Sequence, residues 1–195
     1  MGYPILHDFH LVGSTALSLQ LGHRISIDLD LFTSKDFDTE NILVEIRKKK
    51  NIQVVRQNEQ NSSILNVECP INSKEYVKVD VVKNPYPLLG NVRNEEGLRM
   101  LSYEDIIPMK LSAITNRDTK KDLFNIYELL KLYSIEDMFL FFKRKFPDIK
   151  HFHVLKSLTS FEDAENDFAP ISVNNTDWSM VNEKIEQKVT SFLSK

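Results

Sequence analysis

Apolar and polar residues alternate along the first part of the chain with the two-residue period of β-strands. Residues Phe9–Val12 form a short apolar run that stops at Gly13-Ser14, and Ile or Leu recurs at every second position of Ile25–Thr33 up to Leu31. Between these runs, Thr15–Leu21 has apolar residues at near-helical spacing and is followed by Gly22. The pattern predicts a strand, a glycine turn, a short helix and a second strand.

The pattern beyond Thr33 predicts one helix, three strands and a loop. These are, in chain order, a helix capped by Asp38 or Thr39 and running to about Lys50, strands at Gln53–Arg56, Ile64–Ile71 and Glu75–Lys83, and a loop from Pro85 to Gly97.

From Ser102 the period changes to that of helices. Ser102 followed by Asp105 resembles a capping box, and helical spacing continues to about Phe146 with breaks near Asp118 and Ser134. Two more helices are expected, at His151–Ser160 and Met180–Leu193. The order predicts an α+β fold: an α/β core over residues 1–100 and a helical region over residues 101–195 packed on that core.

Composition narrows the class of protein. The chain has 195 residues, of which 42% are hydrophobic and 27% charged, so it can bury a core and is not expected to be disordered. Its net charge of −3 does not indicate a dedicated nucleic-acid coat protein. Cys69 is the only cysteine, which excludes an intrachain disulfide and a cysteine zinc site. No apolar run reaches the roughly 18 residues of a membrane span, so a soluble, cytoplasmic protein without a membrane partner is expected.

Three carboxylates carry the candidate chemistry. Asp28 and Asp30 lie two residues apart on a predicted strand and so share one of its faces, and Asp80 lies in the same in/out alternation on a later strand. Neighbouring carboxylates repel each other unless a cation lies between them, and Mg²⁺ or Mn²⁺ prefers such oxygen ligands together with phosphate oxygens. These three residues are therefore predicted to bind divalent metal ions for an in-line displacement.

Gly13 and Ser14 are candidates for binding the phosphates of a nucleoside triphosphate (NTP). A Gly-Ser turn at a helix start offers backbone N–H groups to an anion, although Ser14 fits an N-cap role equally well. Each feature alone has an ordinary structural interpretation, a solvated strand face or a simple turn. Their combination, in the order strand, Gly-Ser, helix, paired aspartates and third aspartate, favours catalysis.

This combination resembles the DNA-polymerase-β-type nucleotidyltransferases. The stretch FHLVGSTALSLQLGHRISIDLDLFT, from Phe9 to Thr33, resembles more narrowly the AbiEii/AbiGii toxins of abortive-infection, or type IV toxin–antitoxin, systems. The similarity continues through Lys78–Val81 and Leu101–Leu130. The resemblance implies metal-binding and catalytic roles for Asp28, Asp30 and Asp80, and a nucleotide-contacting role for Lys110. It also implies an RNA acceptor, tRNA 3′ ends in particular, and a cognate antitoxin.

Basic residues in the helical half are secondary candidates. Lys110, Arg117 and Lys121 would fall on one face of a continuous helix, where they could bind a triphosphate, although a solvated charged face explains Arg117 and Lys121 equally well. Lys121-Asp122 fits the motif of the family, but Asn125 stands where the family tends to show a further Asp.

The sequence thus predicts transfer of a nucleoside monophosphate (NMP) from an NTP to an acceptor hydroxyl, with release of pyrophosphate. Two alternatives stay open: nucleotidylation of a small molecule or a protein, and a catalytically inactive module that only binds nucleotides.

Overall fold

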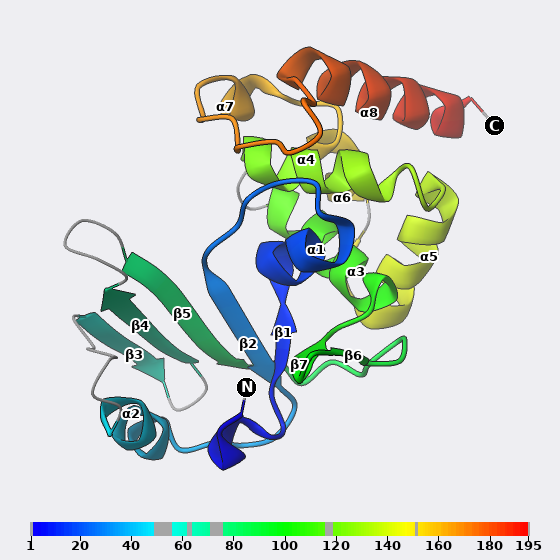
Figure 1. Cartoon of the computed structure of the whole chain (residues 1–195). Coiled ribbons are helices and arrows are strands. Elements are labelled where there is room, and N and C mark those ends of the chain that lie inside the picture. The colour runs from blue at the N-terminus through cyan, green and yellow to red at the C-terminus, as the bar shows by residue number, and fades with distance from the viewer. Residues whose placement is uncertain are drawn as a thin grey trace. The chain divides into compact units, whose positions relative to one another are not determined.

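The computed structural model describes residues 2–48, 56–61, 64–70, 76–115, 119–150 and 152–194 (Figure 1). The chain forms two compact units. The first, the sheet unit, comprises Met1–Ala16, Ser26–Pro87 and Val92–Leu101, and the second, the helical unit, comprises Leu17–Ile25, Leu88–Asn91 and Ser102–Lys195. The division falls inside helix α1 (Gly13–Leu21), so the chain passes repeatedly from one unit to the other.

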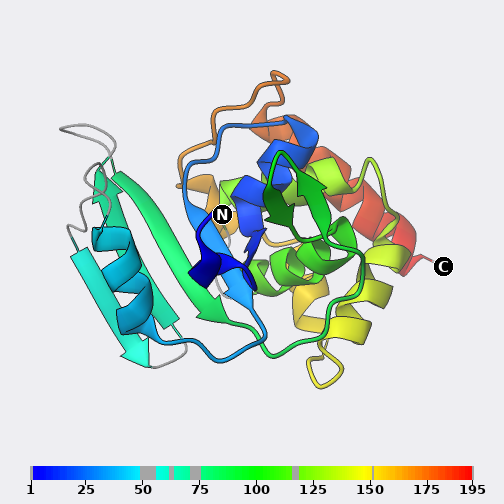
Figure 2. The ribbon, with the colours of Figure 1, turned by 60° about the horizontal axis from the view of Figure 1, so that its bottom comes forward.

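The described residues of the sheet unit form seven strands in the order β3-β4-β5-β2-β1-β7-β6 (Figures 1 and 2). β2 pairs with β5 in parallel, β1 pairs with β7 in parallel, and the other neighbours are antiparallel. The sheet is therefore mixed, and the predicted α+β fold is confirmed. The bounds of the strands are β1 His10–Val12, β2 Leu29–Thr33, β3 Arg56–Asn61, β4 Ile64–Pro70, β5 Tyr76–Lys83, β6 Arg93–Glu95 and β7 Leu98–Met100.

Strand alternation supplies the core of this unit. Leu31 and Val81 are opposite one another on β2 and β5, and Leu65 on β4 follows as the next partner of Val81; all three are buried. A short 3-10 helix, η1 (Pro4–Leu6), precedes β1, and helix α2 (Thr39–Arg47) lies beside β3 and β4 (Figures 1 and 2). The predicted cap is confirmed, because the Asp38 carboxylate accepts hydrogen bonds from the backbone N–H groups of the first turn of α2.

The predicted start of the second strand needs correction. β2 begins at Leu29 rather than at Ile25, because β1 ends at Val12 opposite Asp30 and offers no partner to the residues before Leu29. Asp28 therefore precedes the strand, and Ile27, which the alternation places in the core, is 52% exposed.

The predicted loop, which ends at Gly97, includes strand β6 and the turn of a hairpin, and β7 follows directly after it. Glu96 and Gly97 both have positive φ, 49° and 81°, which is the backbone conformation of a tight two-residue hairpin turn. The strands have only three residues each, too few to show an alternating pattern. Of the strand predicted at 53–56, residues 53–55 lie outside the described residues, and β3 starts at Arg56 and runs on through a polar sequence.

The helical unit confirms the change of period at Ser102. Its helices are α3 Tyr103–Ile114, α4 Lys120–Leu129, α5 Ile135–Lys145, α6 Phe152–Ser157, α7 Glu162–Glu165 and α8 Trp178–Leu193, together with the end of α1. Asp118, where the first break is predicted, lies outside the described residues, but α3 ends before it and α4 starts after it. The second predicted break is confirmed, because Ser134 caps α5 in a complete capping box.

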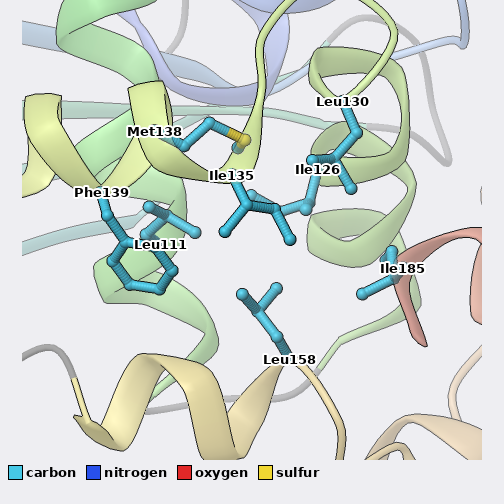
Figure 3. A pocket seen from close by; sticks show the side chains of 8 residues that line it. All are labelled: Leu111, Ile126, Leu130, Ile135, Met138, Phe139, Leu158 and Ile185. Atoms are coloured by element: carbon cyan, nitrogen blue, oxygen red, sulfur yellow. The ribbon is translucent and has the colours of Figure 1, made fainter. Parts of the chain in front are cut away.

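A small pocket lies among these helices (Figure 3). Its eight lining side chains, Leu111, Phe139 and Ile185 among them, are all apolar and face one another. Because the lining has no polar group to orient a substrate, the pocket belongs to the hydrophobic core of the unit.

A buried ion pair joins helices α3 and α5 of the helical unit. The Lys145 Nζ of α5 lies 2.6 Å from Asp105 Oδ1 of α3, and both side chains are fully buried. The Asp105 carboxylate also accepts hydrogen bonds from the backbone N–H groups of Leu89 and Gly90 and from the Ser102 hydroxyl. The capping box predicted at Ser102 is thus wrong, since its hydroxyl bonds to the Asp105 side chain and does not cap α3.

We expect Asp105→Asn to lower the free energy of unfolding by about 3–5 kcal/mol, because it leaves the Lys145 ammonium buried without its counter-ion. The measurement is urea denaturation followed by circular dichroism. Asp36→Asn is the matched control: it removes the exposed partner of Lys83, and such a pair contributes at most about 1 kcal/mol. Equal losses in the two variants would contradict the role given to Asp105.

Candidate active site

The end of strand β1 sets the first part of the site. The chain leaves β1 at Val12, which pairs with Asp30 of β2, and turns at Gly13 into helix α1. Gly13 has a φ of +70°, and a Cβ atom at this position would collide with the Asp30 carboxylate. Glycine is required here both for the left-handed backbone and for the close approach of the chain to Asp30. Ser14, the next residue, is half-buried in the first turn of α1.

The parallel pairing of β2 and β5 supplies the second carboxylate. Asp30 and Asp80 are direct register partners on these neighbouring strands, and both are half-buried. Adjacent strands lie about 4.8 Å apart, and residues opposite each other project from the same face of the sheet. The structure therefore brings together three of the predicted site residues, namely Gly13, Asp30 and Asp80.

Lys78 provides a positive charge at this face. Its Nζ lies 2.6 Å from Asp80 Oδ2, two residues along the same strand, and the Lys78 side chain is half exposed. Two carboxylates on adjacent strands repel each other, and the ammonium group of Lys78 offsets part of this repulsion.

Asp28 precedes strand β2 and is not part of the register that pairs Asp30 with Asp80. It is exposed in the segment before β2, and the Thr15 hydroxyl donates a hydrogen bond to its backbone carbonyl. In the ranges that the structure describes, no group of three or more His, Cys, Asp or Glu side chains is arranged to hold a metal ion. Asp30 and Asp80 nevertheless fit a hard divalent cation, since Mg²⁺ is commonly bound by one or two carboxylates with phosphate and water oxygens.

The helical unit holds the predicted basic residues in different environments. Lys110 of α3 is buried, and its Nζ lies 2.8 Å from Asp122 Oδ1 of α4, while the Thr119 hydroxyl donates to the other Asp122 oxygen. Lys121 is exposed.

The condition for a single basic face, one continuous helix, is not met, because α3 ends at Ile114 and α4 begins at Lys120, so Lys110 and Lys121 do not share a helix. Arg117 lies outside the described residues.

A buried polar cluster in the same unit was not predicted as a site. Asn125 Oδ1 of α4 accepts a hydrogen bond from Arg24 Nε at 3.0 Å and lies 3.0 Å from His23 Nε2. Burial lowers the pKa of His23, against the effect of its hydrogen bond to Asn125, and burial also lowers the pKa of Arg24. One sequence signal for this cluster existed: Asp122 and Asn125 are polar residues one helical turn apart among Leu123, Phe124 and Ile126.

The chain is similar to known proteins in both sequence and structure. Residues 4–193 match the model of a protein family described as nucleotidyl transferase AbiEii toxin of the type IV toxin–antitoxin system. The chain is 31% identical to an uncharacterized protein of Aquifex aeolicus (strain VF5) over 199 residues, which covers 97% of this chain and 90% of the relative.

Two solved structures share the fold. A Helicobacter pylori protein described as a candidate nucleotidyltransferase superposes with a TM-score of 0.61 at 20% identity, covering 94% of this chain and 85% of that protein. MenT4, a nucleotidyltransferase toxin of Mycobacterium tuberculosis H37Rv, also has a TM-score of 0.61, at 14% identity, covering 96% of this chain and 76% of MenT4. At these identities the two structures establish the fold alone.

We expect Gly13→Ala to destabilise the protein more than Gly97→Ala does. Both substitutions strain a backbone with positive φ, by about 1 kcal/mol, but only the Cβ at position 13 meets the Asp30 carboxylate, whereas nothing lies within 4 Å at position 97. The midpoint of thermal unfolding measures the difference. Indistinguishable midpoints would mean that Gly13 does not contact Asp30.

We expect the free energy of unfolding to fall as the pH drops below about 6.5. In this range His23 becomes protonated in the unfolded chain, whereas its lowered pKa keeps it neutral in the folded protein. The lowered pKa of His23 contributes nothing above that pH, and at pH 5.5 its effect is at most about 1.4 kcal/mol. Urea denaturation at pH 8 and pH 5.5 measures this loss, which His23→Gln removes. His153→Gln, which replaces an exposed histidine, is the control, and an unchanged pH dependence in His23→Gln would contradict this assignment.

Proposed function

The chain belongs to the AbiEii family of nucleotidyl transferase toxins of type IV toxin–antitoxin systems, and from that premise we propose that it transfers NMP from an NTP to a hydroxyl group of RNA. The acceptor oxygen forms a bond to the α-phosphorus while the bond to the bridging oxygen breaks, and pyrophosphate leaves. The 3′ end of tRNA is the acceptor that we propose.

The observation that carries the proposal is the pairing of Asp30 with Asp80 next to the Gly13 turn. We propose that these two carboxylates, with Asp28 as a third, bind Mg²⁺ or Mn²⁺. When bound, such ions neutralise phosphate charge and activate the attacking hydroxyl. The strands hold Asp30 and Asp80 rigidly, so the protein supplies positioning, which accounts for much of the acceleration in phosphoryl chemistry.

Nucleotide-binding roles are proposed for Gly13, Ser14, Lys110 and Lys121. Gly13 and Ser14 lie at the start of α1, where backbone N–H groups and the helix dipole favour a phosphate. Lys110 and Lys121 are proposed to add positive charge for the triphosphate. Because Lys110 is ion-paired with Asp122, its ammonium group is already fixed in one position before any nucleotide binds.

The biological setting follows from the family. We propose that the protein acts in the cytoplasm as a growth-inhibiting toxin and that a cognate antitoxin opposes it. Among the described residues no helix is long and apolar enough to cross a membrane.

We expect Asp30→Asn to lower nucleotidyl transfer by at least about a hundredfold, because it removes one of the two paired carboxylates without changing the volume of the side chain. Asp36→Asn is the control, since Asp36 is exposed and pairs with Lys83. Transfer is measured with α-³²P-labelled NTP and total RNA. Wild-type rates in Asp30→Asn would refute the proposed site.

The same assay distinguishes the acceptors when cell extract and small molecules replace the RNA. Label on RNA supports the proposal, and label on tRNA supports its narrower form. Label on a protein or small molecule instead would overturn the choice of acceptor, and nucleotide binding without any transfer would overturn the proposed reaction in this chain.

A further inference from the structure

Arg24 and His23 leave two buried polar atoms without a hydrogen-bond partner. Arg24 Nη2 and His23 Nδ1 are both inaccessible to solvent, and neither has a partner among the described residues. Arg24 is 6% exposed, His23 is 2% exposed, and Asn125, to which both are joined, is fully buried. Buried polar groups are nearly always paired in native proteins, so two orphans on adjacent residues require an explanation.

Among the residues that the structure describes, no carboxylate is hydrogen-bonded to Arg24. Its Nε donates to the Asn125 amide oxygen and its Nη1 to the Ile25 carbonyl, both of which are neutral acceptors. Asp122 is the carboxylate that acts electrostatically on Arg24, and it is already bonded by Lys110 and Thr119. A buried guanidinium without a counter-ion is unfavourable, and an anion that reaches it would satisfy both its charge and Nη2.

His23 offers the complementary group. Its Nε2 faces the Asn125 amide oxygen, which is an acceptor, so Nε2 carries the proton of the neutral ring and Nδ1 carries a lone pair. The lowered pKa of His23 keeps the ring neutral at pH 7. The two orphan atoms are thus one donor and one acceptor, and a ligand that satisfies both must carry an anionic oxygen next to a hydroxyl group.

We propose that Arg24 and His23 bind a ribonucleotide unit, with Arg24 Nη2 donating to a phosphate oxygen and His23 Nδ1 accepting from a ribose hydroxyl. A ribonucleotide presents these two groups close together, and the 2′-hydroxyl is the group that distinguishes RNA from DNA. Asn125 acts as a positioning residue that holds both side chains through one oxygen. The inference rests on the proposed function, since it takes the ligand to be either the NTP or the RNA acceptor.

Residues 171–173 pair with the backbone of His23, Arg24 and Ile25. Ile25 donates its backbone N–H to Ile171 and Val173 donates its own to His23, so residues 171–173 lie along residues 23–25. Ile171 and Val173 are 67% and 58% exposed, so little apolar burial holds this segment in place. In the proposed binding mode the segment gives up its two backbone hydrogen bonds and moves aside to admit the ligand.

The experiment supplies Arg24 with an internal counter-ion. Asn125→Asp is nearly isosteric and places a carboxylate against Arg24 Nε, so we expect at least tenfold weaker binding of a single-stranded RNA octamer together with a higher melting temperature. A residue with only a structural role would not give weaker binding and higher stability together. Asn174→Asp, an exposed substitution in the same unit with the same change of charge, is the control.

A second arm tests the sugar. We expect the wild type to bind the RNA octamer, or ATP, about five- to tenfold more tightly than the matching DNA octamer or dATP, because one hydrogen bond is lost. His23→Gln removes this preference. Whichever of the two pairs shows the preference identifies the source of the ribonucleotide, RNA or NTP. Binding is measured by fluorescence anisotropy with labelled octamers, and by competition for ATP and dATP, in EDTA so that no metal contributes.

Several outcomes overturn the inference: unchanged binding or lower stability in Asn125→Asp, or equal binding of RNA and DNA and of ATP and dATP by the wild type. These failures are distinct from failure of the proposed function. Transfer that survives in Asp30→Asn refutes the catalytic site, whatever Asn125→Asp binds. Loss of transfer in Asp30→Asn, with Asn125→Asp binding as tightly as Asn174→Asp, refutes only the ribonucleotide site.

Discussion

The parallel register between β2 and β5 is the constraint on which the candidate active site depends. It sets Asp30 directly opposite Asp80, and β1, ending after three residues, brings the Gly13 turn against Asp30. A slip of one residue in either strand would turn one carboxylate to the opposite face. The buried partners Leu31 and Val81, one residue further along, oppose such a slip because they would become exposed. The hydrophobic core thus fixes the relative position of the two acidic side chains.

Much of this arrangement could be predicted from the sequence, where the pattern was long or the spacing strict. The α+β class, the Asp38 cap, the helix boundary at Ser134 and the elements that carry Asp30 and Asp80 all follow from periodicity and capping. What failed depended on partners distant in sequence. Alternation continues through Ile25 and Ile27, but β1 is too short to pair with them, so Asp28 precedes the strand. The β6–β7 hairpin was not predicted, because a strand of three residues is too short to show an alternating pattern.

The buried charges of the helical unit were beyond sequence reasoning for another reason. In the sequence, Lys110 and Lys145 look like ordinary surface lysines. In the structure both are buried, Lys110 in an ion pair with Asp122 and Lys145 in an ion pair with Asp105. A lysine on a helix is usually exposed unless it forms an ion pair with a carboxylate from another helix. Local sequence patterns do not indicate such a pair. The family resemblance drew attention to Lys110 but not to its burial. Asn125 likewise appeared to be a departure from a motif, whereas in the structure it joins His23 and Arg24.

The hydrogen bond between Arg24 and Asn125 spans 101 residues of sequence, and this separation bears on how the protein is made. The ribosome synthesises His23 and Arg24 early. Asn125 of α4, to which they bond, is added 101 residues after Arg24. Contacts of such long range form late and slowly. A nascent chain therefore lacks this buried cluster until its synthesis is well advanced.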